Sequence, residues 1–171
     1  DKFANQLREN IEIVEGIYDA FDREAYLAGE VAPVFFGSAV NNFGVRELLE
    51  CFIRIAPSPR TAPTETRVVE PSEHKLSGFI FKIHANMDPN HRDRIAFMRI
   101  VSGRFDRMKE YYHVQGDKPL RLSQPQQMMA QERSVIEEAY AGDIIGVFDP
   151  GIFSIGDTIC DKTTKVQFEG I

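Results

Sequence analysis

The densest group of polar side chains in the sequence lies in residues 84–94, which read HANMDPNHRDR. Two histidines, two aspartates and two arginines lie in this one stretch, so it could bind a metal ion or a phosphate group. A calcium loop is excluded because its sixth position is Asp93 rather than glycine and its twelfth is Arg99 rather than glutamate. A zinc site is disfavoured because the interleaved arginines would repel a cation. The residues therefore predict no metal site here.

Two interpretations of this loop remain open from the residues alone. In the first, His91, Arg92 and Arg94 face RNA, because guanidinium groups pair bidentately with phosphate oxygens. In the second, the stretch is a hydrogen-bonded hairpin loop whose turn is made at residues 88–90 and whose aspartates hold the arginines internally. The sequence favours neither interpretation over the other.

The usual signatures of catalysis are absent from the sequence. It contains no GxxxxGK[ST], no GxGxxG and no GxSxG. Ser38, in the tip Gly37-Ser38-Ala39, has no histidine near it in the sequence that could activate it as a nucleophile. His74 and His113 have no sequence partner and are interpreted as structural. We therefore predict no catalytic residue among these 171 residues.

A second basic stretch, residues 104–109 (RFDRMK), and the following pair Tyr111-Tyr112 could also contact RNA. The simpler interpretation is a solvated turn followed by a strand in which one tyrosine faces the core and the other the surface. Residues 60–171 carry a net charge of only −1, so any attraction to RNA phosphates is expected to be weak in free solution.

Composition and charge restrict the class of protein. A hydrophobic fraction of 43% and a charged fraction of 27% are ordinary for a soluble globular protein, and no apolar run reaches the length of a membrane helix. Cys51 and Cys160 match no zinc-binding or redox spacing, which predicts reduced thiols and a cytoplasmic setting. Residues 1–59 contain ten acidic and five basic residues, a balance of −5, which argues against nucleic acid in this region.

Helical periodicity dominates the first third of the sequence. Apolar residues at steps of three and four from Phe3 to Phe21 predict an amphipathic helix, and a shorter helix is expected to end at Gly29. The apolar run at 34–36 predicts a strand buried on both faces, and the pattern at 45–53 predicts a helix ended by Pro57. Helix, strand and helix are the end of an α/β layer. Because one strand cannot make a sheet, we expect this region to be part of a longer protein.

The rest of the sequence has the period of β-strands. Residues 57–73 are rich in Pro, Thr, Arg and Glu, which indicates a linker and an edge segment. Short alternating runs separated by Gly and Asp turns then predict a small antiparallel barrel or sandwich. The expected strands are residues 78–83, 94–101, 111–114, 120–122, 134–138, 144–148 and 158–160.

Several of these motifs together resemble a known family. The segments VFFGSA and FGVRELLECFIRIAPSP resemble the last guanine-contacting segment and closing helix of the translational GTPases. GFIFKI, RIAFMRIVSGRF and EEAYAGDIIGVFDPGIFSIGDTIC resemble the β-barrel second domain of those proteins. Within the superfamily, ANMDPNHRDRIAFMR and FDREAYLAGEVAPVFFGSAVNNFGV are similar to the class II release factors of translation termination.

The resemblance implies a fold class, a domain organisation and site residues. The fold class is mixed: a C-terminal piece of an α/β GTPase domain (residues 1–59), a linker (60–73), a small antiparallel β-barrel of the translation-factor second-domain type (74–165) and the start of a third domain (166–171). By resemblance, backbone N–H groups of Ser38 and Ala39 contact the guanine O6 atom. His91, Arg92 and Arg94 are expected to face ribosomal RNA.

The resemblance also implies a function and partners. The full-length protein is expected to bind GTP or GDP with Mg²⁺ and to release and recycle codon-reading release factors. Its barrel is expected to dock on the RNA and proteins of the small ribosomal subunit. The phosphate-binding loop, DxxG and NKxD are not in these residues, so this chain alone is expected neither to bind nor to hydrolyse GTP.

Two other functions remain as alternatives. The first is another translational GTPase, such as elongation factor G or a ribosomal-protection protein. The family resemblance gives those proteins a different, glycine-containing loop where this chain has HRDR at residues 91–94. The second is a free-standing barrel that binds RNA or protein. An apolar face left exposed on the helices around Leu7, Val14, Phe35 and Phe52 would argue against that second alternative.

Overall fold

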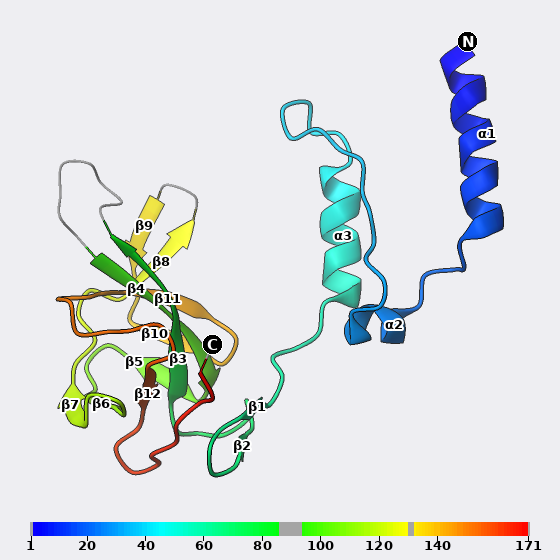
Figure 1. Cartoon of the computed structure of the whole chain (residues 1–171). Coiled ribbons are helices and arrows are strands. Elements are labelled where there is room, and N and C mark those ends of the chain that lie inside the picture. Colours follow the sequence, from blue (N-terminus) through cyan, green and yellow to red (C-terminus); the bar gives the residue numbers. More distant parts are fainter. Residues whose placement is uncertain (1, 86–93, 130–131, 171) are drawn as a thin grey trace. The chain divides into compact units, whose positions relative to one another are not determined.

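The computed structural model describes residues 2–85, 94–129 and 132–170 (Figure 1). The chain divides into two compact units, Asp1–Pro57 and Ser58–Ile171. The first unit is helical and the second is made of strands, as the change of sequence period predicts.

The helices of the first unit begin and end at the expected signals. Asp22 precedes the short second helix, and its Oδ1 accepts a hydrogen bond from Glu24 N (2.7 Å), which caps the helix. Gly29 ends that helix with φ of 80°. The first helix ends at Ile17, before the predicted end at Phe21. The helices are α1 (Lys2–Ile17), α2 (Arg23–Ala28) and α3 (Val45–Ile55).

The predicted strand at 34–36 is wrong for this chain. Val34 and Phe36 are 76% and 85% exposed, and the pairing found here among the described residues is a single bridge between Ser38 and Phe43. A strand needs a neighbour to accept its backbone hydrogen bonds. No described segment of this unit supplies one, so the run stays extended, unpaired and largely exposed.

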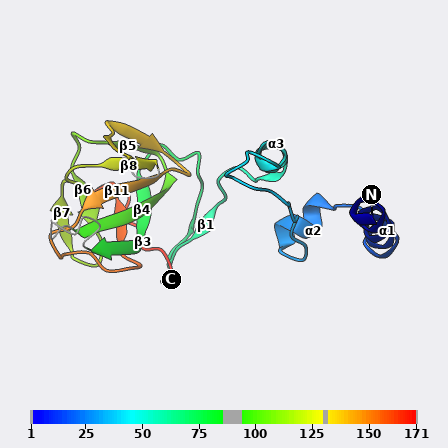
Figure 2. The ribbon, with the colours of Figure 1, turned by 90° about the horizontal axis from the view of Figure 1, so that it is seen from above.

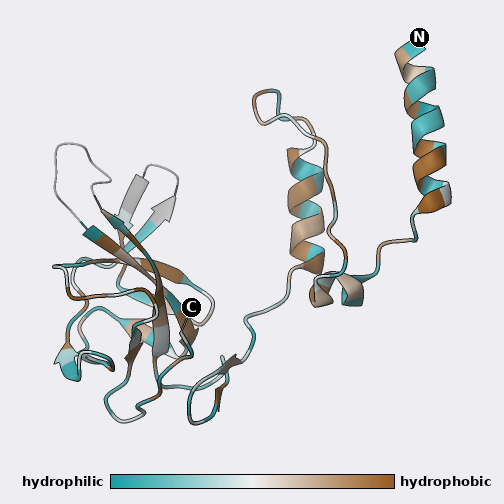
Figure 3. Cartoon of the chain, in the orientation of Figure 1, coloured by the Kyte–Doolittle hydropathy of each residue, from teal (hydrophilic) through white to brown (hydrophobic). Residues whose placement is uncertain are grey.

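Apolar side chains on the helices of the first unit remain exposed. Figure 3 shows apolar positions running along both α1 and α3. Leu7, Val14 and Phe52 are all more than half exposed, whereas Phe35 is half-buried. The predicted exposed face is therefore present for three of its four residues.

Short strands make up the second unit. Their bounds are β1 (Ala62–Pro63), β2 (Val68–Val69), β3 (Ser77–Ala85), β4 (Arg94–Ser102), β5 (Arg104–Asp106), β6 (Tyr111–His113), β7 (Lys118–Leu120), β8 (Gln126–Met129), β9 (Glu132–Val135), β10 (Glu138–Tyr140), β11 (Ile144–Phe148) and β12 (Thr158–Cys160).

Eight of these strands form one antiparallel sheet in the order β7-β6-β12-β3-β4-β11-β8-β9. Two small sheets, β1-β2 and β10-β5, accompany it. The view in Figure 2 shows the strands curling around a common interior. The protein thus has the predicted mixed fold, with helices followed by a small antiparallel β-barrel.

Apolar side chains at alternate positions along the strands fill the interior of this barrel. In the β4–β11 pair, Met98 faces Ile145 and Ala96 faces Val147, and all four are buried. A second, smaller cluster packs Val69 and Phe168 against the end of the sheet. The main core consists of Leu76, Ile80, Ala96, Met98, Ile100, Phe105, Tyr111, Leu122, Ala139, Ile145, Val147, Phe153 and Ile159.

Several strand predictions differ from the structure in bounds or number. The strand expected at 134–138 is two strands, because β9 pairs with β8 whereas β10 pairs with β5. β5 and β8 were not predicted, and the strand expected at 120–122 is β7, which ends at Leu120. Which strand a segment pairs with depends on tertiary contacts, so the local alternation of apolar and polar residues does not reveal it.

Candidate functional site

The loop between residues 37 and 44 is closed tightly by its own backbone. Ser38 N donates to Phe43 O (2.8 Å) and Phe43 N donates back to Ser38 O (3.0 Å). Gly44 follows with φ of 73°, and a Cβ atom there would stand 2.3 Å from Phe36 O. Only glycine fits this position, because both the conformation and the close approach exclude a side chain.

The two residues predicted to contact guanine have different environments in this loop. The Ser38 N–H is already used by Phe43, and the Ser38 Oγ accepts from Asn41 Nδ2 (3.2 Å) and more weakly from Asn41 N (3.4 Å). Ala39 is exposed, and none of the described residues accepts a hydrogen bond from its N–H. The loop therefore offers the Ala39 N–H to a ligand, and Ser38 shapes the loop.

Of the three residues predicted to face RNA, Arg94 is the one that the structure describes. His91 and Arg92, like Asp88 and Asp93, lie outside the described residues. Arg94 begins β4, and its Nη2 lies 3.0 Å from Asp149 Oδ2. The side chain of Arg94 is 44% exposed. Arg94 therefore has an internal partner in Asp149.

The Asp149 side chain is fully buried at the end of β11. Its Oδ1 accepts hydrogen bonds from Gly151 N (2.8 Å), Ile152 N (2.9 Å) and Phe153 N (3.3 Å). Its Oδ2 has no directed hydrogen bond among the described residues, so the close approach of Arg94 is an ion pair without hydrogen-bond geometry. The backbone adds a further link, since Asp149 N donates to Arg94 O (2.9 Å).

The sequence contained only part of this arrangement. Asp149-Pro150-Gly151 is a recognisable turn, and an aspartate that accepts from the following N–H groups is the usual chemistry of such turns. The ion pair with Arg94 joins residues far apart in the sequence, and the pairing of β4 with β11 brings them together. That pairing could not be predicted from local residue types.

His113 is buried and structural, as predicted. Its Nε2 lies 2.8 Å from Asp157 Oδ2, and its ring packs edge-on against Phe153. The same Asp157 oxygen accepts from Ser154 N (2.8 Å), so the pair ties β6 to the turn before β12. At 2% exposure, His113 has no access to a substrate.

The part of the chain that the structure describes contains neither a metal-ligand cluster nor a membrane-spanning helix. No three His, Cys, Asp or Glu side chains come close enough there to hold a metal ion. None of the described helices is both long and apolar enough to span a bilayer.

Comparison with known proteins places the barrel in a family. The family model for elongation factor G domain 2 matches residues 75–162, slightly more than half of the chain. The chain belongs to this family. Its domain 2 barrel contains Arg94 and Asp149, whereas the 37–44 loop precedes it.

Two curated relatives extend the similarity beyond the domain 2 barrel. A protein of Symbiobacterium thermophilum named peptide chain release factor 3 is 55% identical over 97% of this chain. A protein of Gloeobacter violaceus with the same name is 50% identical over 97% of this chain. The match covers 31% of each relative, so the chain spans less than a third of their length. The predicted resemblance to class II release factors is confirmed.

Proposed function

We propose that this chain is part of a ribosome-dependent GTPase of translation termination, which releases and recycles codon-reading release factors. The observation that carries the proposal is the identity of 50–55% over 97% of the chain to two proteins named peptide chain release factor 3. The match covers 166 of the 171 residues, so it extends over both units.

In this proposal the 37–44 loop recognises guanine. The Ala39 N–H donates to the O6 atom, and the Ser38 side chain holds the loop in shape. A base with an amine in place of O6 would leave the N–H unpaired, which costs on the order of 1–3 kcal/mol. GTP or GDP with Mg²⁺ is the cofactor of the full-length protein. The groups that contact phosphate and Mg²⁺ lie outside these residues, so this chain alone binds no nucleotide measurably.

The barrel docks on the small ribosomal subunit in this proposal, with His91, Arg92 and Arg94 facing its RNA. Asp149 holds one edge of the Arg94 guanidinium and leaves the other edge for a phosphate. The partners are thus ribosomal RNA and proteins together with the codon-reading release factors. A cytoplasmic location goes with this role, and both cysteines are free thiols in the structure.

GTP turnover by the full-length protein, with and without ribosomes, tests the proposal. Arg92→Ala combined with Arg94→Ala should lower the ribosome-stimulated turnover and leave nucleotide affinity unchanged, because the two arginines contact RNA rather than nucleotide. Arg107→Ala is the matched control, since Arg107 is a barrel arginine paired with Glu137 on the surface. A parent protein whose turnover does not respond to ribosomes would contradict the proposed function.

The nucleotide selectivity of the full-length protein tests separately whether the 37–44 loop recognises guanine. The full-length protein should bind GDP at least about tenfold more tightly than the 2-aminopurine riboside diphosphate, which lacks O6. Ala39→Pro removes the N–H and should abolish this preference, whereas Ala39→Gly keeps the N–H and should retain it. An unchanged preference in Ala39→Pro would exclude Ala39 as the donor.

A further inference from the structure

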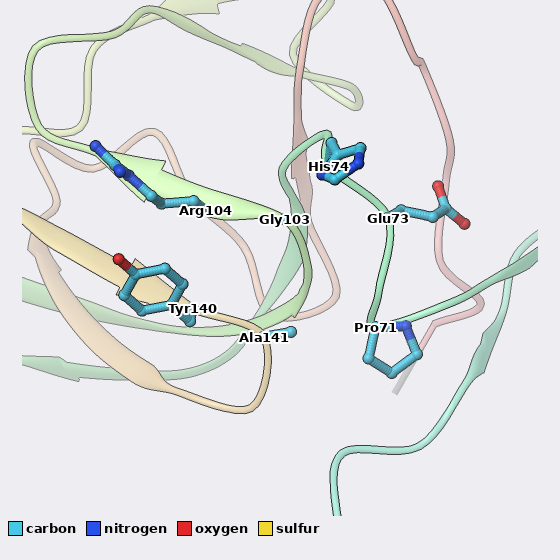
Figure 4. Close-up of a pocket in the computed structure, with 7 residues that line it drawn as sticks. All are labelled: Pro71, Glu73, His74, Gly103, Arg104, Tyr140 and Ala141. Carbon is cyan, nitrogen blue, oxygen red and sulfur yellow. The ribbon is translucent and has the colours of Figure 1, made fainter.

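A pocket of about 310 Å³ opens on the barrel (Figure 4). This volume lies at the lower end of the range for sites that bind small ligands. The turn at residues 71–74, the β4–β5 turn and β10 all contribute to it. The lining residues are Pro71, Glu73, His74, Gly103, Arg104, Tyr140 and Ala141.

The floor of the pocket is rigid without a ligand. Gly103 has φ of 70°, and a Cβ atom there would stand 2.4 Å from the Lys75 carbonyl carbon. Ser102 Oγ donates to Lys75 O (2.9 Å) and lies 2.6 Å from Ser77 Oγ. These contacts fix the β4–β5 turn against the segment before β3, so the pocket is formed in advance.

The carboxylate in the pocket wall is already neutralised. Arg67 donates to both oxygens of Glu73, at 2.6 and 2.8 Å, and Glu70 N donates to the same carboxylate (2.9 Å). The hydrogen bonds from Arg67 hold the pKa of Glu73 below its ordinary value. Glu73 therefore stays paired, and its charge opposes an entering anion only weakly.

A tyrosine and an arginine form the opposite side. Arg104 and Tyr140 are direct partners across the β5–β10 pair, and Figure 4 shows their side chains lying alongside each other. Their neighbours Phe105 and Ala139 point into the core, which fixes the outward direction of this pair. Tyr140 is half exposed and lines the pocket, so its ring is accessible to a ligand there.

Arg104 is available to an anion. Its Nε lies 3.3 Å from Glu138 Oε2, and both side chains are about half exposed. Exposed ion pairs of this kind contribute little to stability, so Arg104 can exchange Glu138 for another anion at small cost. The exposed imidazole of His74 makes no hydrogen bond or ion pair to the described residues and adds a further polar group at the pocket.

We propose that this pocket binds one unpaired nucleotide of RNA, with its base against Tyr140 and its phosphate on Arg104. An aromatic face beside a guanidinium group is the combination by which proteins recognise single-stranded RNA. The choice of RNA as the partner rests on the proposed ribosomal function. The site is additional to the basic loop, since none of its residues lies in 84–94.

Binding of a short fluorescein-labelled oligouridylate to the full-length protein tests this proposal. Tyr140→Leu should weaken binding about tenfold, the effect of one lost base-stacking contact. Tyr140→Phe keeps the ring and should bind within about twofold of the parent. Arg104→Gln should weaken binding and lower its salt dependence by about one counterion. Arg107→Gln, on the neighbouring turn, is the matched control and should have little effect.

Three results would overturn the proposal. One is unchanged binding by Tyr140→Leu when circular dichroism shows a folded barrel. A second is equal binding of double-stranded RNA, which offers no free base. A third is unchanged binding by Arg104→Gln, which would show that no phosphate is bound by Arg104. None of these readouts requires GTP. If any of these results were found while ribosome-stimulated GTP turnover was still observed, the pocket proposal would be rejected and the proposed function would be retained.

Discussion

The carboxylate of Asp149 joins two parts of the barrel that are distant in the sequence. It holds the turn after β11 through three backbone N–H groups and pairs with Arg94 at the start of β4. A buried charge is tolerated only where such partners compensate it. The same carboxylate orients Arg94, the arginine that we propose faces RNA. Asp149 therefore contributes both to the stability of the barrel and to the proposed RNA contact.

Asp149→Ala should therefore destabilise the barrel by about 3 kcal/mol or more, because three backbone N–H donors lose their acceptor and Arg94 loses its ion-pair partner. Urea unfolding of the 171-residue chain, followed by circular dichroism, measures the effect. Asp106→Ala is the control, since its Oδ1 accepts one hydrogen bond, from Met108 N (2.9 Å), near the surface. A control that loses as much stability as Asp149→Ala would contradict this role.

The buried hydroxyl of Tyr111 leads to a prediction about how stability depends on pH. Its ring is buried, and its hydroxyl accepts from Asp106 N (2.6 Å) and donates to Asp106 O (3.0 Å). Burial raises the pKa of Tyr111 to about 12. The unfolded phenol ionises near pH 10, so the stabilisation is complete below about pH 10 and is lost as pH rises through about 12.

Tyrosinate absorbance during an alkaline titration checks this prediction. One of the five tyrosines should titrate late in the folded protein, and Tyr111→Phe should remove that late component. If all five tyrosines of the folded protein ionised together near pH 10, the assignment to Tyr111 would be wrong.

At the scale of the element, tight turns decide the shape of both proposed sites. Gly103 should not tolerate a side chain, since its φ is positive and a Cβ would collide with the Lys75 backbone. We expect Gly103→Ala to cost about 2–3 kcal/mol or more. Gly16→Ala, in α1 with nothing within 4 Å, should be neutral or slightly stabilising. Urea midpoints of the two variants provide the comparison, and equal midpoints would refute the strained turn.

The sequence predicts the elements better than their pairing. Helical spacing located α1 and α3, and alternation located β3, β4 and β11, because each pattern places apolar residues on one face of the element. The run at 34–36 has the composition of a buried strand, yet strand formation depends on a neighbour that composition does not reveal. Arg94 was a candidate from the sequence, whereas its partner Asp149 and the pocket beside Tyr140 arise only when distant strands meet.

At the scale of the whole molecule, the two units differ in how completely they are packed. The barrel unit has two clusters of buried hydrophobic residues, whereas among the described residues of the first unit only Ile55 is a buried hydrophobic residue. Because the chain spans less than a third of its relatives' length, we expect the exposed helix faces to pack against other parts of the full-length protein.

The 171-residue chain should consequently self-associate as its concentration rises. Leu7→Gln combined with Val14→Gln removes apolar surface from α1 and should reduce this association in sedimentation velocity. Ile144→Gln with Ile155→Gln, at exposed positions of the barrel, is the matched control and should change it little. A chain that stays monomeric at every concentration would contradict the expectation of an unpartnered face.

Multiple-turnover peptide release tests the central claim most directly. Terminated ribosomes are supplied with a limiting amount of a codon-reading release factor and GTP, with or without the full-length protein that contains this chain. Our account predicts that the protein lets each release factor act on many ribosomes, and that it does so only with GTP. Peptide release that stops at one round per release factor, with or without the protein, would contradict the assignment to termination.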